Sequence, residues 1–436
     1  MARRPRTDVP ESTVGAFRHR DFRLLFGGIL PSNVGYWMQE FAVGWLVVLV
    51  AQREGNPALA GFYLGLRGMA TAVPSLVIGL VAGAYADRVD RRSMLVYSRL
   101  ASALVALVLT IVIVTDQVGI AVLVVIAAAS AAAYAFEPPT RQALLPRIVP
   151  DGDLFSAMGM MRAALQGSQT LGPLFGGLLI VPLGIASVAL GKVGLMLLSI
   201  PFLRQMRPQP VVLEPGAPGV LGSLREGLRH MRADPLIRWC LILQLVFAVS
   251  AQAVIQLLPA VAVEMLGVGA VELSWLIAAV GAGTVLGAMF LATIGRVVRR
   301  GLLLLGLMVA GGATVVGLGL QRELPGALVV AAALGVLQQL FMGTHAVILQ
   351  LGAPDRLRGR VMGTQAVIFQ GVGPVGVLVI GSIGSLIGIS TAIIGAGIVL
   401  AAVAIIAGFR VAVVRDLRRA DNPLAQPAEP GPDQIV

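Results

Sequence analysis

The chain has 436 residues, of which 57% are hydrophobic and only 13% are charged, and its formal net charge is +11. A soluble protein carries about 25% charged residues, so the composition excludes an ordinary soluble domain and predicts a helical membrane protein. The basic residues lie in short segments between long apolar runs, where positive-inside topology places them. This pattern favours the lipid bilayer over nucleic acid as the partner of the positive charge.

Twelve membrane-spanning helices are predicted from the apolar runs. A run of about 20 apolar residues crosses the hydrocarbon layer as a helix. Between charged breaks, the predicted spans are 23–50, 59–85, 93–115, 118–137, 153–180, 185–203, 236–262, 271–294, 301–321, 326–351, 361–386 and 389–411. We therefore expect an all-α membrane protein.

The longest polar interval divides the spans into two groups of six. The expected organisation is a cytoplasmic tail at 1–22, a six-helix bundle at 23–203, a cytoplasmic linker with an amphipathic helix at 204–235, a second six-helix bundle at 236–411 and a partly disordered cytoplasmic tail at 412–436. Arginines recur in alternate loops, so the positive-inside rule predicts a cell-membrane protein with both termini in the cytoplasm. An even number of spans agrees with this topology.

The first span carries an acidic residue at a depth where apolar residues are expected. Glu40 lies about 25 Å along the helix from Arg23, at 1.5 Å per residue. Tyr36 and Trp37 precede it by one turn on the same face, and Gln39 is adjacent. An aromatic surface beside a carboxylate suits an amphipathic or cationic ligand. These four polar and aromatic residues are the first predicted substrate-binding group.

Arg67 in the second span is the expected neighbour of Glu40. The two residues are nearly equidistant from the loop centred near Glu54, so they should lie at similar depth on adjacent helices. A carboxylate that is partly desolvated or close to an opposing charge can bind and release a proton. We predict that Glu40 and Arg67 interact or share a cavity and take part in proton coupling, with a purely structural ion pair as the alternative.

Two pairs of similar segments indicate an internal duplication. The segment "DRVDRR" at 87–92 matches "GRVVRR" at 295–300, and "GPLFGG" at 172–177 matches "GPVGVL" at 373–378. The members of each pair are separated by about half of the chain. Membrane proteins built from two related halves are typically transporters that hold substrate between the halves. The duplication therefore predicts two pseudo-symmetric six-helix bundles.

The segment at 83–92 resembles the signature loop between helices two and three of the major facilitator superfamily. The matching residues are Gly83, Asp87, Arg88, Arg91 and Arg92, with Asp90 where a glycine is usual. The resemblance implies that Asp87 caps the cytoplasmic end of helix eleven and pairs with nearby arginines, forming a conformational latch between the halves. A carboxylate is favoured at a helix N-terminus, whereas an ordinary positive-inside loop would explain the arginines and not Asp87.

The fifth span resembles the motif that this superfamily associates with antiporters. The matching residues are Gly159, Gly172, Pro173, Gly176 and Gly177, with Ser168 where a glycine is usual. The resemblance implies export against protons, and simple tight packing of helices is the alternative. The segments 136–150 and 353–363 resemble the branch that includes the enterobactin exporter and related drug-efflux proteins. This resemblance covers essentially the whole chain.

Further polar residues lie inside the predicted spans. We expect a substrate-binding lining of the central cavity from Arg162 and Gln166 in span five, Gln252 and Gln256 in span seven, and Gln339 in span ten. His345 in span ten is a candidate proton relay, with hydrogen bonding between helices as the alternative.

Three other charged residues within the spans are given smaller roles. Arg99 is expected to extend toward the cytoplasm, and Glu137 to mark the cytoplasmic edge of span four beside Pro138 and Pro139. Glu137 is also a candidate latch partner of Arg141. Lys192 is expected to line the outer half of the cavity or to anchor its helix at the membrane interface.

Together these features predict a secondary transporter and not an enzyme. It would export a small amphipathic or cationic molecule, drug-like or a siderophore, against protons by alternating access, and it would act as a monomer. An importer or uniporter on the same fold, or a non-transporting membrane scaffold, are the alternatives. The sequence has no phosphate-binding loop, one cysteine and no cluster with metal-ligand spacing. No cofactor or metal is therefore expected.

Overall fold

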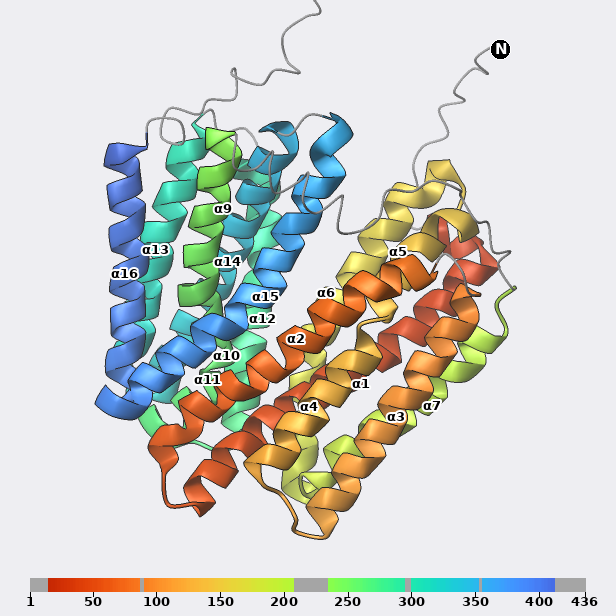
Figure 1. Ribbon diagram of the computed structural model, residues 1–436, viewed down its shortest axis with the longest axis horizontal. Coiled ribbons are helices and arrows are strands. Elements are labelled where there is room, and N and C mark those ends of the chain that lie inside the picture. Colours follow the sequence, from red (N-terminus) through yellow and green to blue (C-terminus); the bar gives the residue numbers. More distant parts are fainter. Residues whose placement is uncertain (1–14, 87–89, 208–233, 295–298, 353–354, 412–436) are drawn as a thin grey trace, which may run out of the picture.

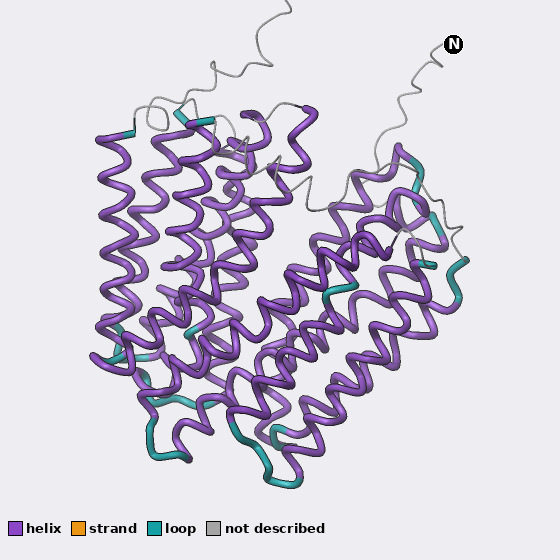
Figure 2. Tube along the Cα trace, viewed as in Figure 1, coloured by secondary structure: helices purple, strands orange, loops and turns teal. Residues whose placement is uncertain are grey.

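The computed structural model describes residues 15–86, 90–207, 234–294, 299–352 and 355–411, and every regular element within these ranges is helical. Figure 1 shows two helical bundles beside one another, α1 to α7 in one and α9 to α16 in the other. Figure 2 shows helix over nearly the whole trace, joined by short loops. The predicted linker helix at 204–235 lies largely outside the described residues.

The N-terminal bundle begins after a short 3₁₀ turn, η1 (Gly15–Arg18), and contains a second one, η2 (Pro57–Leu59). Its helices are α1 (Arg20–Arg53), α2 (Ala60–Ala86), α3 (Arg91–Val114), α4 (Ile120–Tyr134), α5 (Glu137–Ile148), α6 (Asp151–Leu183) and α7 (Ala186–Arg204). Span four is built from α4 and α5 together, because Pro138 and Pro139 occupy the first turn of α5. Proline is tolerated there, so the pair starts a new helix where we expected the span to end.

The C-terminal bundle repeats the plan with one irregular span. Span seven is assembled from α9 (Pro235–Phe247), η3 (Ala248–Gln252) and α10 (Ala253–Gln256). After this span follow α11 (Leu258–Ala260) and η4 (Val261–Met265), and both η3 and η4 are π-helical. The remaining helices are α12 (Ala270–Ile294), α13 (Arg300–Leu320), α14 (Leu324–Gly352), α15 (Asp355–Ile387) and α16 (Ile389–Arg410).

The twelve spans and their pairing follow the predicted duplication. Ten helices within the described residues are long and apolar enough to cross a membrane, and α6 and α15, with 33 residues each, complete the twelve. The packing repeats between the bundles: α3 packs on α7 as α13 packs on α16, and α2 packs on α4 as α12 packs on α14. The predicted all-α fold of two pseudo-symmetric six-helix bundles is confirmed.

The bundles meet along two seams, α2 against α15 and α6 against α12. On the first seam Gly65 faces Leu378 so closely that a Cβ on Gly65 would lie 2.3 Å from the Leu378 Cα. On the second, a Cβ on Gly177 would lie 2.4 Å from the Ser274 Cβ. Glycine permits this close approach of helices. Both contacts lie away from the end where α1 begins and α16 ends.

The two ends of the molecule therefore differ. We call the end that carries the start of α1 and the end of α16 the termini end. Figure 1 shows the bundles converging at the opposite end and diverging toward the termini end. The close glycine contacts of the two seams explain the convergence, since they hold the halves together in that part of the molecule.

Candidate functional site

The predicted contact between Glu40 and Arg67 is present. Arg67 Nη2 on α2 forms an ion pair with Glu40 Oε2 on α1 and also lies 3.3 Å from the Glu40 carbonyl oxygen. The side chains are 17% and 14% exposed, so both keep some access to solvent. Arg67 lies between Gly65 and Gly68, which face α15. The ion pair therefore lies beside the seam between the bundles.

An aromatic group lies one helical turn from Glu40. The rings of Tyr36 and Tyr134 are stacked at 4.1 Å, and Trp37 meets Tyr36 edge to face at 5.5 Å. All three side chains are partly exposed. Lys192 Nζ lies 5.6 Å from the centre of the Tyr36 ring, on the geometry of a cation–π contact. The three aromatic rings therefore form one surface, with the Glu40 carboxylate within one helical turn and the Lys192 amine over the Tyr36 ring.

Gln39, the other predicted substrate-binding residue of α1, lies in a helix contact. Its side chain is 1% exposed, and Nε2 donates to Ser130 Oγ at 2.7 Å. Because successive residues on a helix are about 100° apart, the residue next to Glu40 turns toward α4. Gln39 thus packs α1 on α4.

A second charged group, which the sequence analysis did not identify as a site, surrounds Glu137. Glu137 is fully buried, forms an ion pair with Arg99 and accepts from Arg141 Nη1 at 3.3 Å. Asn33 Nδ2 donates to the same carboxylate at 3.0 Å, and the Tyr134 hydroxyl donates to Asn33 Oδ1 at 3.2 Å. We expected Glu137 at the edge of its span and Arg99 extended toward solvent. Both expectations are wrong, because α5 continues span four and Arg99 is 1% exposed.

The polar stripe of span five is exposed where the bundles separate. Arg162 is exposed, Gln166 is partly exposed, and Gln166 Nε2 donates to Gln169 Oε1 at 3.2 Å. Helical spacing places Arg162 and Gln166 on the face of α6 that carries Thr170 and Gly177, which touch α12. Arg162 and Gln166 therefore face the C-terminal bundle on the side nearer the termini end.

The motif residues of span five pack two helices against α6. A Cβ on Gly172 would lie 2.6 Å from the Trp37 Cβ, and one on Gly176 would lie 2.9 Å from the Phe41 ring, so these glycines bring α1 close. Gly177 contacts α12 across the seam, and Pro173 is buried within an uninterrupted helix. Nothing lies within 4 Å of a Cβ on Gly159.

Only part of the expected latch lies among the described residues. Gly83 lies in α2, whereas Asp87 and Arg88 fall outside those residues. Arg91 begins α3 and is buried, and Arg92 Nη1 donates to the Met206 carbonyl at 2.9 Å, which joins α3 to the end of α7. The predicted capping of α15 by Asp87 stays a prediction.

Asp90, in the loop between α2 and α3, has a structural role at the start of α3. Asp90 stands where the family has a glycine, and its carboxylate accepts from the Ser93 amide at 3.2 Å and from the Ser93 hydroxyl at 2.8 Å. Asp90 is thus the N-cap of α3, a position that aspartate favours.

The polar residues of the C-terminal bundle form an uncharged network. His345 is fully buried, with Nε2 at 3.0 Å from the Cys240 carbonyl oxygen and Nδ1 at 3.0 Å from Gln365 Nε2. Gln244 Nε2 donates to the Gln365 carbonyl at 3.2 Å. This pattern describes a neutral imidazole that donates from one nitrogen and accepts at the other. It fits hydrogen bonding between helices better than the proton relay that we considered for His345.

The remaining predicted glutamines lie on helices of the same bundle. A Cβ on Gly373 of α15 would lie 3.1 Å from Gln256 Nε2 and 3.7 Å from Gln252 Nε2, so these amides face the Gly-Pro segment of that helix. The Gln339 Cβ would lie 2.9 Å from a Cβ on Gly287, which places Gln339 at the contact of α14 with α12.

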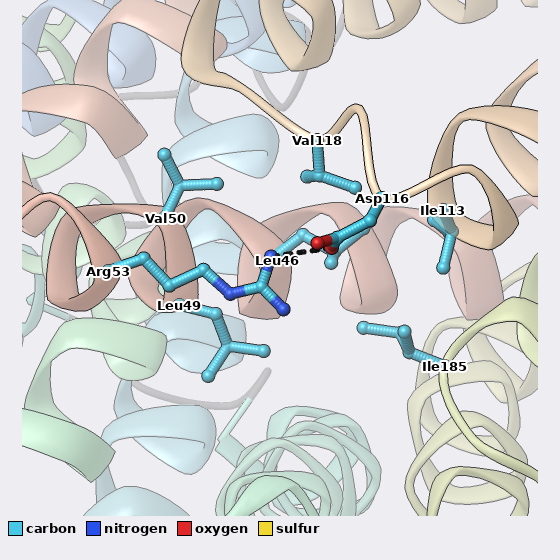
Figure 3. A pocket seen from close by; sticks show the side chains of 8 residues that line it. All are labelled: Leu46, Leu49, Val50, Arg53, Ile113, Asp116, Val118 and Ile185. Atoms are coloured by element: carbon cyan, nitrogen blue, oxygen red, sulfur yellow. Dashed lines mark hydrogen bonds and ion pairs between the residues drawn. The ribbon is translucent and has the colours of Figure 1, made fainter.

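Figure 3 shows a small pocket on the N-terminal bundle alone. It is lined by Leu46, Leu49, Val50, Arg53, Ile113, Asp116, Val118 and Ile185. Arg53 Nη1 and Asp116 Oδ1 form an exposed ion pair at 2.9 Å across it. The pocket lies at the end opposite the termini and away from Glu40. Within the described ranges, no three His, Cys, Asp or Glu side chains are grouped to hold a metal ion.

Two related six-helix bundles, joined at one end and carrying buried charges beside their seam, define a membrane transporter of the major facilitator class. Residues 11–431 match the family described as "Transmembrane secretion effector". The chain belongs to this family of the major facilitator superfamily. The family is a family of transporters, so the prediction that the protein is not an enzyme is confirmed.

The chain resembles efflux pumps in sequence and transporters in fold. It is 26% identical to the multidrug efflux pump Tap of Mycolicibacterium fortuitum, over 92% of this chain and 98% of the pump, and 26% identical to the uncharacterized MFS-type transporter YfiS of Bacillus subtilis, over 76% and 79%.

Among solved structures, an inward-facing, unoccupied bacterial homologue of the human lysosomal transporter Spinster has a TM-score of 0.67 at 15% identity, over 91% of this chain and 98% of that one. The nucleoside transporter NupG also has a TM-score of 0.67, at 12% identity, over 87% of this chain and 99% of the other. At such low identity these neighbours support the fold alone.

Proposed function

We propose that the protein is a proton-coupled exporter of small amphipathic cations that works by alternating access. The similarity to multidrug efflux pumps supports export of drug-like compounds. The antiporter-type motif of α6, whose glycines pack on α1 and α12, supports exchange between two conformations. Siderophores remain the second substrate class, on the sequence resemblance to the branch of the enterobactin exporter.

The observation that carries the proposal is the environment of Glu40. Among the described residues its carboxylate forms an ion pair with Arg67 alone, keeps 17% exposure and lies one turn from Tyr36 and Trp37. Glu137, in contrast, is fully buried and holds three donor side chains, so its charge is fixed. Of the two, Glu40 is the carboxylate that a cationic ligand can reach. A cation that binds over the aromatic rings beside Glu40 would favour loss of a bound proton.

Orientation in the membrane follows from the basic residues of the termini end. Arg20 and Arg23 lie at the start of α1, Arg92 at the start of α3 and Arg300 at the start of α13. By the positive-inside rule this end would face the cytoplasm of the cell membrane. The divergence of the bundles at that end then corresponds to a conformation open to the cytoplasm, ready to load substrate for export.

The test is transport by purified protein in liposomes, with ethidium as the cationic probe. We expect ethidium movement to drive proton movement in the opposite direction, and Glu40→Gln to reduce that proton movement at least about tenfold because the amide cannot ionise. Glu54→Gln is the matched control: Glu54 is exposed, ends the same helix and accepts from the Tyr63 hydroxyl at 2.8 Å.

The outcomes separate the alternatives. Unchanged coupling in Glu40→Gln would remove Glu40 from the mechanism. Ethidium exchange that ignores an imposed proton gradient in the wild-type protein would identify a uniporter. No exchange of ethidium or of a siderophore under any gradient would overturn the proposal of an exporter altogether.

A further inference from the structure

Lys192 is the single lysine of the chain, although the sequence has 33 lysine and arginine residues together. It lies in α7 and is 1% exposed. Arginine stays charged in proteins, whereas a buried lysine can release its proton. Apart from the histidines, Lys192 is therefore the one basic side chain of this protein that can exist as a neutral base, and it is also one of its most buried side chains.

The surroundings of Lys192 connect it to the aromatic group of α1. Gly35 allows α1 to approach α7, since a Cβ on Gly35 would lie 3.4 Å from the Lys192 Cα. The Lys192 amine lies over the Tyr36 ring at 5.6 Å. Glu40 on α1 and Arg99 on α3 are the charged groups that act on the amine. The third helix packed on α7 is α6, whose Arg162 is exposed.

Lys192 has no carboxylate of its own. Among the described residues its amine makes no hydrogen bond or ion pair, and its one specific contact is with the Tyr36 ring. Glu40 is paired with Arg67, and Glu137 is shared by Arg99 and Arg141. Basic groups thus outnumber acidic groups in this buried region. An ammonium removed from water without a paired anion is costly, so its charge depends on what else occupies the region.

We propose that Lys192 is a proton-binding residue of the transport cycle, whose ammonium competes with a cationic substrate for the Tyr36 ring and the charge of Glu40. The proposal rests on the proposed function as an exporter of cations. When substrate leaves, the amine takes one proton from water and forms one N–H bond. When substrate binds, that bond breaks and the proton returns to water. The Lys192 ammonium and the cationic substrate thereby take turns over the Tyr36 ring.

Two substitutions separate the proton from the packing of the side chain. Lys192→Met keeps the length without the amine, and Lys192→Arg keeps the charge permanently. We expect both variants to carry ethidium down its own gradient, while fewer protons move per ethidium than in the wild-type protein, since neither side chain can cycle a proton and Glu40 alone remains to do so. Arg53→Met, which removes an exposed cation at the far end of α1, is the matched control and should keep full coupling.

Ethidium affinity as a function of pH is the more specific readout. In the wild-type protein the affinity should fall by up to about tenfold for each pH unit below the transition of the amine, as one competing proton requires. Lys192→Met should bind tightly and lose the part of this slope that the amine contributes, and Lys192→Arg should bind weakly at all pH values. A merely structural role would lower affinity without changing the slope, and an unchanged slope in both variants would overturn the proposal.

A single lysine also allows direct observation. With lysine labelled at the side-chain nitrogen, the protein in nanodiscs should give one side-chain signal that Lys192→Arg removes. We expect that signal to report loss of the proton as the pH is raised, at lower pH when ethidium is present. An amine whose charge is the same with and without ethidium at every pH would refute the role of Lys192. Coupled transport in the same preparation would leave the proposed function intact.

Discussion

The buried centres of the two bundles are built from different chemistry on one helix plan. In the N-terminal bundle Glu137 and Arg99 are at most 1% exposed and form an ion pair, and Lys192 lies nearby with the same burial. In the C-terminal bundle the described polar centre consists of side-chain amides, two backbone carbonyls and the neutral ring of His345. A duplicated fold has thus placed charged side chains in the centre of one half and uncharged hydrogen-bonding groups in the centre of the other.

The difference suggests a division of labour within the duplicated fold. Buried charges respond to a cation or a proton across several ångströms, whereas amide networks act only at contact distance. The N-terminal bundle would then carry the ionic chemistry. The C-terminal bundle would supply a rigid partner and the irregular, π-helical span seven that faces α15. Four experiments can break or sharpen this comparison.

The largest effect is expected at Glu137. Glu137→Ala would leave Arg99 and Arg141 buried without their carboxylate, which costs about 3–5 kcal/mol. We expect loss of folded protein, or a large drop in the unfolding midpoint in detergent, measured by thermal unfolding. Glu54→Gln, at an exposed carboxylate, should leave the midpoint unchanged.

A double variant shows whether the charge or the side-chain volume is responsible. Arg99→Met combined with Glu137→Met replaces the ion pair by apolar groups of similar size and should recover the part of the lost stability that comes from unpaired Arg99, while Arg141 stays without its carboxylate. A double variant as unstable as Glu137→Ala would show that the network acts through shape, and the contrast between the halves would lose its electrostatic basis.

The seam between α2 and α15 provides the second test, because its close contacts hold the two bundles together at the end opposite the termini. Gly65→Leu cannot be accommodated against the Leu378 backbone, and overpacking of this kind costs about 1–3 kcal/mol. The population should shift about tenfold or more toward a form that is separated at the end opposite the termini.

Spin labels at positions 116 and 322, in loops of opposite bundles at that end, would report the shift as a longer distance. Gly79→Leu is the matched control on the same helix, since nothing lies within 4 Å of its Cβ. Equal distances in both variants would contradict the close contact of α2 with α15.

His345 provides the third test, on the uncharged side of the comparison. His345→Ala removes one ring that joins α9, α14 and α15, and we expect a loss of about 1–3 kcal/mol in stability because the Gln365 amide is left unpaired. Coupled transport per folded molecule should persist, since the ring carries no proton in this scheme. If His345→Ala lost proton-coupled transport while keeping wild-type stability, His345 would belong to the proton pathway. The C-terminal bundle would then take part in the ionic chemistry as well.

The sequence predicts the fold better than the site for identifiable reasons. Apolar runs and basic loops locate twelve spans, and counting residues from a loop was enough to pair Glu40 with Arg67. The cluster at Glu137 was missed because Pro138 and Pro139 were read as the end of a span, although they start α5 within it. The partners of Gln39 and Lys192 depend on helix rotation and on close approach at glycines, which periodicity alone does not determine.

The smallest effect concerns a carboxyl of the C-terminal bundle outside its spans. Glu264 lies in η4, its Oε1 is buried without a hydrogen-bond partner among the described residues, and burial raises its pKa from 4.5 to about 7. The folded state therefore holds a proton that the unfolded state releases between these values, so stability should fall as pH rises from about 4.5 to about 7 and then level off.

Because the Glu264 side chain is partly exposed, solvent screening reduces the effect to about 1 kcal/mol or less. The measurement is the unfolding midpoint in detergent between pH values of about 5 and about 8, for the wild-type protein and Glu264→Gln. The variant should lose this pH dependence and match the wild-type protein at the acidic limit. An identical slope in both would mean that Glu264 ionises freely, and that the C-terminal bundle has no perturbed acid at this edge.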